Sequence, residues 1–241
     1  MASSKEHYEN VLTPVYSWMY GGFPAALERN SAFFSAHGIA PRGCARALDL
    51  GAGCGFQSIP LARIGYVVTA IDTDRQLLDE LQSHANGLDI TTVEDDLLNF
   101  RSHVPGHVEL AVCMTDTILH LSSRLKVEQL VKQVHRGLEP GGKFVITFRD
   151  FTRELNELDR FIPVRSDLNT IFTCFLEYEP DTVKVHDLVY RRSDTQWDFA
   201  RSFYRKLRLS EEWIRKRIST AGFTQVDCDA LDGLITLVAT K

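Results

Sequence analysis

The sequence lacks the patterns that mark several large classes of protein. No run approaches the roughly 18 consecutive apolar residues of a membrane-spanning helix, and the first residues, MASSKEH, have no apolar secretory core. The five cysteines include no C-x-x-C pair, and their odd number and wide spacing argue against a disulfide framework or a structural zinc site. We therefore expect a cytoplasmic protein with reduced thiols, no bound metal and no membrane contact.

An excess of basic charge is also missing. The chain has 27 lysines and arginines against 32 aspartates and glutamates, a formal net charge of −5. An extensive basic face for DNA or RNA is not expected from this balance, so nucleic acid is not a predicted partner. The 241 residues, 44% apolar and 24% charged, are typical of an ordinary globular protein and suffice for one large α/β domain.

What is present is a glycine-rich stretch near residue 50. Residues 47–56 read ALDLGAGCGF, in which a short apolar run and an acid precede Gly51, Gly53 and Gly55. This pattern predicts a buried strand, a tight turn and a helix N-terminus. Glycine allows positive φ and lets a ligand approach the backbone, while the start of the helix offers unpaired N–H groups. The stretch is typical of a nucleotide-binding turn.

Apolar strand patterns and helical patterns alternate around this stretch, which favours a parallel sheet with right-handed crossovers. Ligands of such sheets bind beyond the carboxyl ends of the strands. Asp49, Asp72, Asp96 and Asp116 stand at or near those ends. We expect these acids to line one cleft around a hydroxyl-rich, cationic ligand, because four unrelated buried acids would be costly. The strand patterns occupy residues 42–50, 66–71, 90–94, 108–114 and 143–148.

The remaining segments divide one predicted domain into parts. Residues 1–40 form a helical arm rich in aromatic side chains, which either packs over the domain or closes over a ligand through Tyr16. Residues 41–150 form the cofactor-binding core. Residues 165–208 read as an antiparallel insertion of three β-segments, and residues 209–241 as a closing helix and hairpin.

Two families combine a glycine turn with an acid about 20 residues later. Dinucleotide-binding domains need G-x-G-x-x-G, in which the pyrophosphate lies on the helix N-terminus. Here Gly55 arrives one position early, and Phe56 stands where that motif requires glycine. A nicotinamide-dependent oxidoreductase is therefore the weaker alternative.

The second family is the class I S-adenosylmethionine-dependent methyltransferases. The residues DLGAGCG at 49–55 resemble motif I of that family, and Asp72, Asp96, CMTDT at 113–117 and LEPGG at 138–142 match its later motifs in order. The resemblance covers roughly residues 44–150. It implies an α/β, Rossmann-like methyltransferase fold: a mostly parallel seven-stranded sheet, helices on both faces and a small antiparallel β insertion. It also implies S-adenosyl-L-methionine as cofactor and S-adenosyl-L-homocysteine as product.

The resemblance further implies roles for single residues. Asp72 would accept hydrogen bonds from both ribose hydroxyls, Asp96 would bind the adenine amino group, and Asp49 would lie near the cofactor's ammonium. The candidate cofactor-binding residues are Tyr16, Asp49, Gly51, Ala52, Gly53, Asp72, Thr73, Asp96, Leu97, Met114 and Thr115.

The methyl acceptor is predicted to be a small molecule. The N-P-P-[YF] tetrad of exocyclic-amine DNA methyltransferases is absent after Val112, and so are the paired glutamates of protein-arginine enzymes. His120 and Asp116 are the candidate catalytic residues, because His120 follows the fourth strand and imidazole suits proton removal near neutral pH. Arg149 and Arg165 are candidate contacts for an acidic acceptor.

Three alternatives stay open at this point. The protein could bind S-adenosylmethionine without methylating an acceptor, or it could methylate a nucleic acid. The β insertion could cover the acceptor pocket or form the contact of a homodimer.

Overall fold

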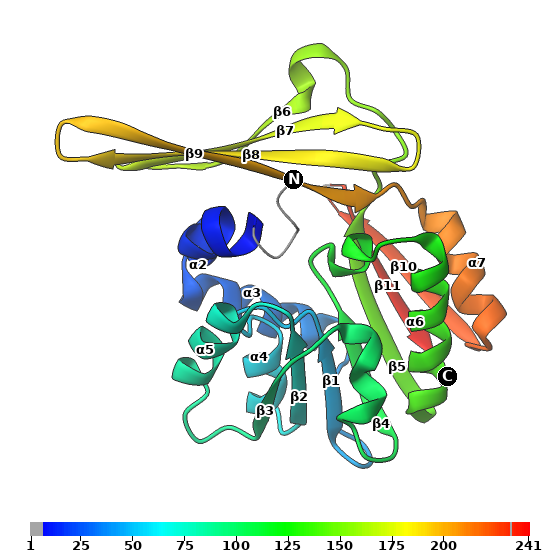
Figure 1. Ribbon diagram of the computed structural model, residues 1–241. Coiled ribbons are helices and arrows are strands. Elements are labelled where there is room, and N and C mark those ends of the chain that lie inside the picture. The colour runs from blue at the N-terminus through cyan, green and yellow to red at the C-terminus, as the bar shows by residue number, and fades with distance from the viewer. Residues whose placement is uncertain (1–6, 232) are drawn as a thin grey trace.

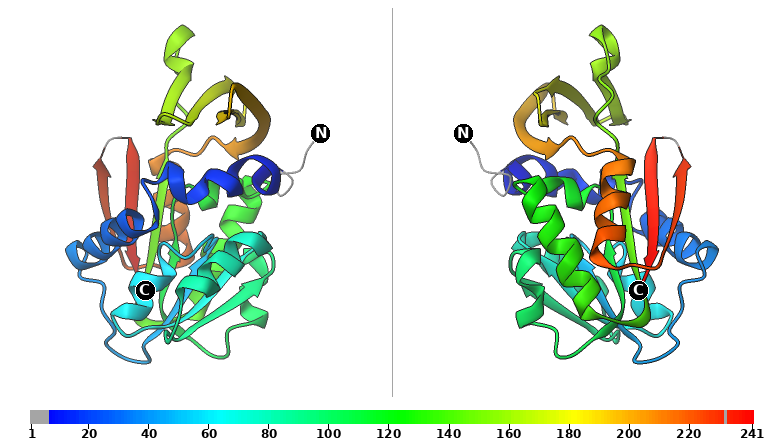
Figure 2. Two further views of the ribbon diagram at one scale, coloured as in Figure 1. Left: turned by 90° about the vertical axis from the view of Figure 1, so that its left-hand side faces the viewer. Right: turned by 90° about the vertical axis from the view of Figure 1, so that its right-hand side faces the viewer.

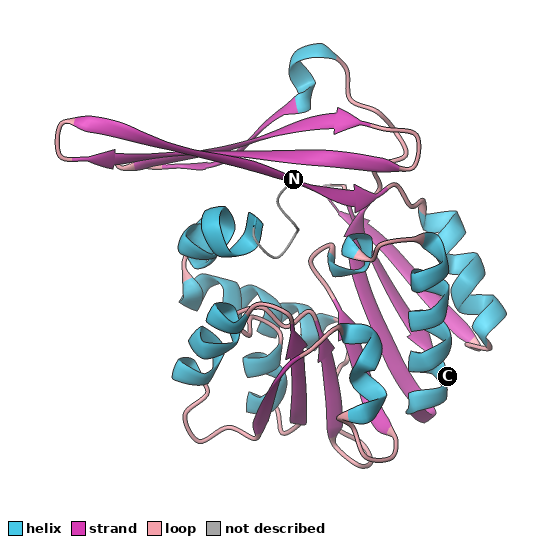
Figure 3. Ribbon diagram, in the orientation of Figure 1, coloured by secondary structure: helices cyan, strands magenta, loops and turns pink. Residues whose placement is uncertain are grey.

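The computed structural model describes residues 7–231 and 233–241. Two sheets make up the molecule, with helices around the larger one and an N-terminal helical arm between the two sheets (Figure 1). Figure 3 shows the same arrangement by secondary structure. No helix in the described part of the chain is long and apolar enough to cross a membrane.

The larger sheet has seven strands in the order β10-β11-β5-β4-β1-β2-β3. Only β11 runs antiparallel to its neighbours, β10 and β5. The mostly parallel sheet predicted above is confirmed. Its strands are β1 (Arg46–Leu50), β2 (Val67–Asp72), β3 (Ile90–Glu94), β4 (Val108–Cys113), β5 (Leu138–Arg149), β10 (Gln225–Leu231) and β11 (Leu234–Thr240).

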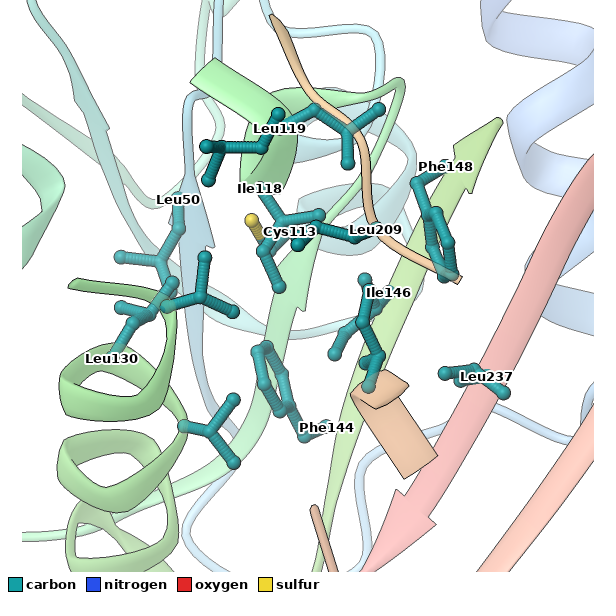
Figure 4. Packing of buried hydrophobic residues seen from close by; sticks show 14 of the residues in the cluster. Leu50, Cys113, Ile118, Leu119, Leu130, Phe144, Ile146, Phe148, Leu209 and Leu237 are labelled. Atoms are coloured by element: carbon teal, nitrogen blue, oxygen red, sulfur yellow. The ribbon is translucent and has the colours of Figure 1, made fainter. Parts of the chain in front are cut away.

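Helices cover both faces of this sheet because successive strand residues point to opposite sides. On one face Leu61 and Leu81 pack in a cluster with Ala47. On the other, Val131 packs in a cluster with Leu48, part of which Figure 4 shows. Each such side chain contributes about 1.5–3 kcal/mol when fully buried. The helices are α3 (Phe23–Ala36), α4 (Ser58–Arg63), α5 (Arg75–His84), α6 (Arg124–Gly137) and α7 (Glu211–Ala221).

Two of the helices have side-chain caps at their first turns. Asp74 accepts hydrogen bonds from the N–H groups of Gln76 and Leu77 at the start of α5. Ser210 caps α7, which ends at Gly222 with φ +107°. These caps set the angles at which the helices leave the strand ends.

The sequence pattern predicts a strand at residues 143–148, but in the structure this strand begins earlier, directly after α6. The helix ends at Gly137, and β5 begins at once at Leu138. A Cβ on Gly142 would stand 2.9 Å from the backbone oxygen of Glu139 and 3.0 Å from that of Glu109. The LEPGG motif is therefore a crowded entry into β5, at which the register with β4 shifts.

The second sheet is antiparallel and confirms the predicted β insertion (Figure 1). It has four strands rather than three. The first strand was not predicted from the sequence, because Pro163 interrupts its strand pattern. The pairing of this strand with the next shifts register between Pro163 and Arg165. The strands, in order across the sheet, are β6 (Phe161–Ser166), β7 (Thr170–Tyr178), β8 (Thr182–Ser193) and β9 (Gln196–Leu207).

The N-terminal arm consists of three short helices that precede α3 (Figure 2). His7 binds Asp187 of β8 through Nε2 and Oδ2 at 2.8 Å, and Thr13 donates to Asp74 at the same distance. These bonds fasten the arm to both sheets. Its helices are η1 (Tyr8–Leu12), η2 (Thr13–Val15) and α2 (Tyr16–Met19).

Candidate functional site

The glycine-rich turn joins β1 to α4, and its glycines have different tasks. Gly51, Gly53 and Gly55 have φ values of +79°, +52° and +91°. A Cβ on Gly51 would lie 2.3 Å from Thr117 Cγ2, and one on Gly55 would lie 2.6 Å from Leu81 Cγ. A Cβ on Gly53 would have no neighbour nearer than 3.6 Å. Close packing therefore requires two of the glycines, whereas at Gly53 the positive φ, rather than crowding, favours glycine.

Asp72 ends β2 beside this turn. Its Oδ2 accepts the N–H of Gly53 at 2.7 Å, and its Oδ1 accepts the N–H of Asp74 at 2.9 Å. Burial raises the pKa of this carboxyl, and the two hydrogen bonds oppose the rise. Each oxygen still has a lone pair for another donor.

A cavity of about 300 Å³, here called the glycine-loop cavity, opens at this carboxylate. It brings together most of the cofactor-binding residues predicted from the sequence, together with His120. The predicted residues in its lining are Tyr16, Gly51, Gly53, Asp72, Thr73, Asp96, Leu97, Thr115 and His120.

Three of the predicted cofactor-binding residues do not line this cavity. Asp49 is 1% exposed and accepts the hydroxyl hydrogen of Ser58 at 2.6 Å. Burial raises the pKa of Asp49 to about 7. Ala52 and Met114 pack in the core cluster on one face of the sheet. The expected rim of four acids is thus only partly formed.

The neighbouring acids Asp95 and Asp96 are used differently. Asp95 binds His103 Nε2 at 2.7 Å and the amide of Asn99 at 2.8 Å. Asp96 accepts the N–H of Leu98 through Oδ1. Among the described residues Oδ2 of Asp96 has no hydrogen-bond donor. The structure therefore offers Asp96, rather than Asp95, as the acid free to bind a ligand in the cavity.

Asp116 is buried in an ion-pair cluster. Its Oδ2 lies 2.8 Å from both Arg149 Nη1 and Lys206 Nζ, and its Oδ1 accepts the backbone N–H of Arg149. Burial would raise the pKa of Asp116, but Lys206 and Arg149 outweigh it and hold the pKa well below its usual value. A carboxylate bound by two cations is a weak proton acceptor, so Asp116 is placed to position these two side chains.

A second cavity of about 530 Å³, the arm–sheet cavity, lies between the N-terminal arm and strands β6–β9. Asp116, Arg149 and Arg165 all line it. It shares Tyr8, Tyr16 and Thr115 with the glycine-loop cavity, so these residues form a common wall. The other aromatic and charged residues in its lining are Tyr20, Arg29, Phe151, Phe172, Asp187, Tyr204 and Lys206.

His120 lies at this common wall. Its Nε2 is 3.3 Å from the hydroxyl oxygen of Tyr8, and its ring stacks on that of Tyr204 with centroids 5.2 Å apart. Burial and the charge of Lys206 lower the pKa of His120 to about 3. Burial raises the pKa of Tyr8 well above its usual value, so a neutral phenol and a neutral imidazole share this hydrogen bond, and the imidazole tautomer decides which of them donates.

Tyr8, Tyr204 and Lys206 are site residues that sequence reasoning missed. The N-terminal arm and β9 bring them to β4, across most of the length of the chain. The aromatic residues of the arm were a visible signal, but nothing near Lys206 in the sequence indicates Asp116 as its partner.

A possible metal-binding group lies away from both cavities. One ligand atom each from Cys44, Glu109 and Glu139 lies within 4.8 Å of the others. Glu109 already accepts the backbone N–H groups of Arg42 at 2.5 Å and Gly43 at 2.8 Å. Its carboxylate thus has a structural task in holding the segment that enters β1.

Residues 47–142 match the family model described as a methyltransferase domain. The matched range contains the glycine turn, Asp72, Asp96 and the LEPGG motif, and it confirms the resemblance seen in the sequence.

Two of the curated relatives align with less than half of this chain. A glycine/sarcosine N-methyltransferase of Aphanothece halophytica is 25% identical over 117 residues, which cover 48% of this chain and 44% of the relative. A ubiquinone biosynthesis O-methyltransferase of Haemophilus ducreyi is 35% identical over 103 residues, covering 40% and 42%. The chain thus spans less than half the length of these relatives.

Solved structures match the fold over nearly the whole chain. DesVI of Streptomyces venezuelae superposes with a TM-score of 0.76 at 16% identity, covering 94% of this chain and 97% of its own. The CcbJ methyltransferase of Streptomyces caelestis gives 0.72 at 20% identity, covering 90% and 95%. The fold of this chain is therefore one that these solved structures share.

Proposed function

We propose that this protein is an S-adenosylmethionine-dependent methyltransferase that acts on an oxygen, nitrogen or sulfur atom of a small molecule. The observation that carries the proposal is the wall shared by the two cavities, formed by Tyr8, Tyr16 and Thr115. One cavity has the glycine turn and acids suited to a nucleoside, and the other has aromatic and basic side chains. A group can pass between ligands in the two cavities only at this wall.

The glycine-loop cavity fits the cofactor in its chemistry. Asp72 has lone pairs for the ribose hydroxyls, Asp96 has an oxygen for the adenine amino group, and Gly53 presents bare backbone to the methionyl part. Its volume lies at the lower end of the usual range for small-molecule sites. When bound, S-adenosylmethionine supplies a methyl group already activated by its sulfonium.

The residues of the chain then have to orient the acceptor and exclude water. Holding two reactants in line contributes about 7–11 kcal/mol in favourable cases, without a covalent intermediate. Tyr16 and Tyr8 of the arm are part of the wall, and a hydrogen bond with His120 orients the hydroxyl of Tyr8. We propose that the Tyr8–His120 pair positions the acceptor atom rather than removing its proton.

The second cavity supports a small molecule as the acceptor. At about 530 Å³ it lies within the range of small-molecule sites and is covered by the arm and strands β6–β9. The net charge of −5 also disfavours a nucleic-acid substrate. A homodimer and a cytoplasmic location stay predictions, which sedimentation and cell fractionation test.

The proposed function is tested by the affinity of Asp72→Ala for S-adenosylhomocysteine. Losing a charged acceptor of two hydrogen bonds costs about 1.5–3 kcal/mol for each bond, so calorimetry should show an affinity at least 50-fold weaker. Asp79→Ala is the matched control, because Asp79 is an exposed acid on α5 that pairs only with Arg75. Unchanged affinity in Asp72→Ala, or a wild-type protein that ignores the nucleoside, would refute the proposal. Tight binding with no S-adenosylhomocysteine formed from S-adenosylmethionine across an acceptor panel would instead identify a non-methylating protein.

A further inference from the structure

Two arginines from distant segments converge in the lining of the arm–sheet cavity. Arg29 comes from α3 and Arg165 from β6. A Cβ on Gly21 would stand 3.3 Å from Arg165 Nη1 and 3.6 Å from Arg29 Nη1, so both guanidinium groups approach one point. Gly21 itself has φ +88° and no side chain, which leaves this space open.

Both guanidinium groups are held in place by the arm. Arg29 donates from Nη2 to the backbone oxygen of Tyr20. Arg165 lies over the ring of Trp18, 5.5 Å from its centroid. The indole N–H of Trp18 in turn donates to Asp167 at 2.6 Å. Arg29 and Arg165 are both exposed, and these contacts hold their guanidinium groups beside Gly21 in the cavity lining.

Neither arginine has a carboxylate partner within ion-pair distance in the described part of the chain. Asp167 lies close enough for Arg165 to help lower its pKa, but its carboxylate is bound by Trp18 and backbone N–H groups. The two acids in the cavity lining are occupied: Asp116 by two cations, and Asp187 by His7 and the thiol of Cys174. The lining therefore has more positive than negative charge, in a protein whose net charge is −5.

We propose that the methyl acceptor carries an anionic group, a carboxylate or a phosphate, which Arg29 and Arg165 bind together. Two like charges side by side repel each other, and an anion between them removes that repulsion. The planar guanidinium fork matches the oxygen pairs of carboxylates and phosphates. The aromatic lining would hold the rest of the acceptor, with its reacting atom at the wall of Tyr8, Tyr16 and Thr115. The statement that the bound molecule is the methyl acceptor rests on the proposed function, whereas the anion site formed by Arg29 and Arg165 does not.

Binding of three benzene derivatives to the wild-type protein with S-adenosylhomocysteine present tests the proposal. The probes are benzoate, phenyl phosphate and the neutral benzamide, measured by ligand-observed NMR. We expect at least one of the two anions to bind tenfold or more tightly than benzamide. Preference for phenyl phosphate would identify a phosphate site, and preference for benzoate a carboxylate site. Equal binding of benzamide and both anions would overturn the proposal.

The variants Arg29→Gln and Arg165→Gln locate the site. Each should weaken binding of the preferred anion at least fivefold and leave benzamide binding unchanged. Arg136→Gln is the control for loss of one positive charge, because Arg136 is exposed on α6 and outside both cavities. Anion binding that survives in both cavity variants, or that falls equally in the control, would contradict the assignment. S-adenosylhomocysteine affinity, measured in the same samples, reports separately on the proposed function.

Discussion

The glycine-loop cavity and the arm–sheet cavity share a wall but are built in different ways. The first is formed mainly by backbone and short acidic side chains at the ends of adjacent parallel strands. The second is formed by long aromatic and basic side chains from the arm, β5 and the antiparallel sheet. A site formed by backbone groups restricts which residues can occupy its positions. A site formed by side chains can come to bind a different ligand when those side chains are substituted. Under the proposed function, the first cavity specifies the cofactor and the second specifies the acceptor.

The largest effect is expected from Gly51→Ala in the glycine-loop cavity. A positive φ costs about 1–2 kcal/mol in a non-glycine residue, and the new Cβ would overlap the stiff side chain of Thr117. We expect loss of S-adenosylhomocysteine binding by more than 100-fold and a lower melting temperature. Gly87→Ala is the control, because Gly87 has a similar φ of +73° but open space around it. Equal behaviour of the two variants would show that the backbone of the turn is not specifically required.

A smaller effect on the shared wall is expected from Tyr8→Phe. Removing the hydroxyl that is hydrogen-bonded to His120 should lower kcat at least tenfold, because the acceptor atom is less well positioned. The affinity for S-adenosylhomocysteine should change less than twofold. Tyr190→Phe on β8, outside both cavities, is the matched control. A Tyr8→Phe variant with wild-type turnover would remove Tyr8 from the mechanism.

Asp49→Asn should stabilise the protein in a pH-dependent way. The pKa of Asp49 is raised to about 7, so between pH 4 and 7 the unfolded chain loses a proton that the folded protein keeps. Stability is lost as pH rises through this window, and asparagine avoids the loss while it still accepts the Ser58 bond. The expected gain is about 2–4 kcal/mol at pH 8 and nearly zero at pH 4, read from urea unfolding. A gain that does not vary with pH would contradict the raised pKa, and exposed Asp79→Asn serves as control.

The smallest effect is expected at His120, whose imidazole should not titrate near neutral pH. Because burial and Lys206 lower the pKa of His120 to about 3, its imidazole should stay neutral between pH 8 and 5. The side-chain resonance of His120, assigned by its disappearance in His120→Gln, should not shift over this range. A transition near pH 6.5 would contradict the lowered pKa of His120 and would support the general-base role predicted from the sequence.

Sequence patterns predict the parts of this molecule in which the determining residues are neighbours. The glycine turn, Asp72 at the end of β2 and the cap at Asp74 are local features, and the structure places each where the pattern indicates. The fold class follows from the alternation of such features. The position of Asp49 beneath the turn was not predictable, because its partner Ser58 is an ordinary helix residue in the sequence.

The side-chain pairs inside the arm–sheet cavity could not be predicted, because their members lie far apart in the sequence. Asp116 and Lys206 are separated by 90 positions, and His7 and Asp187 by 180. Pairs of residues so far apart leave no periodic pattern in the sequence. Pro163 also concealed a strand, so the sheet that carries Arg165 was predicted without its first member.

The presence of Tyr8 and Tyr16 in the lining of both cavities has a kinetic consequence under the proposed function. Any movement of these two side chains alters both binding sites at once. Occupancy of one site should therefore change the rate at which the other ligand enters or leaves, and stopped-flow binding measurements would detect that change.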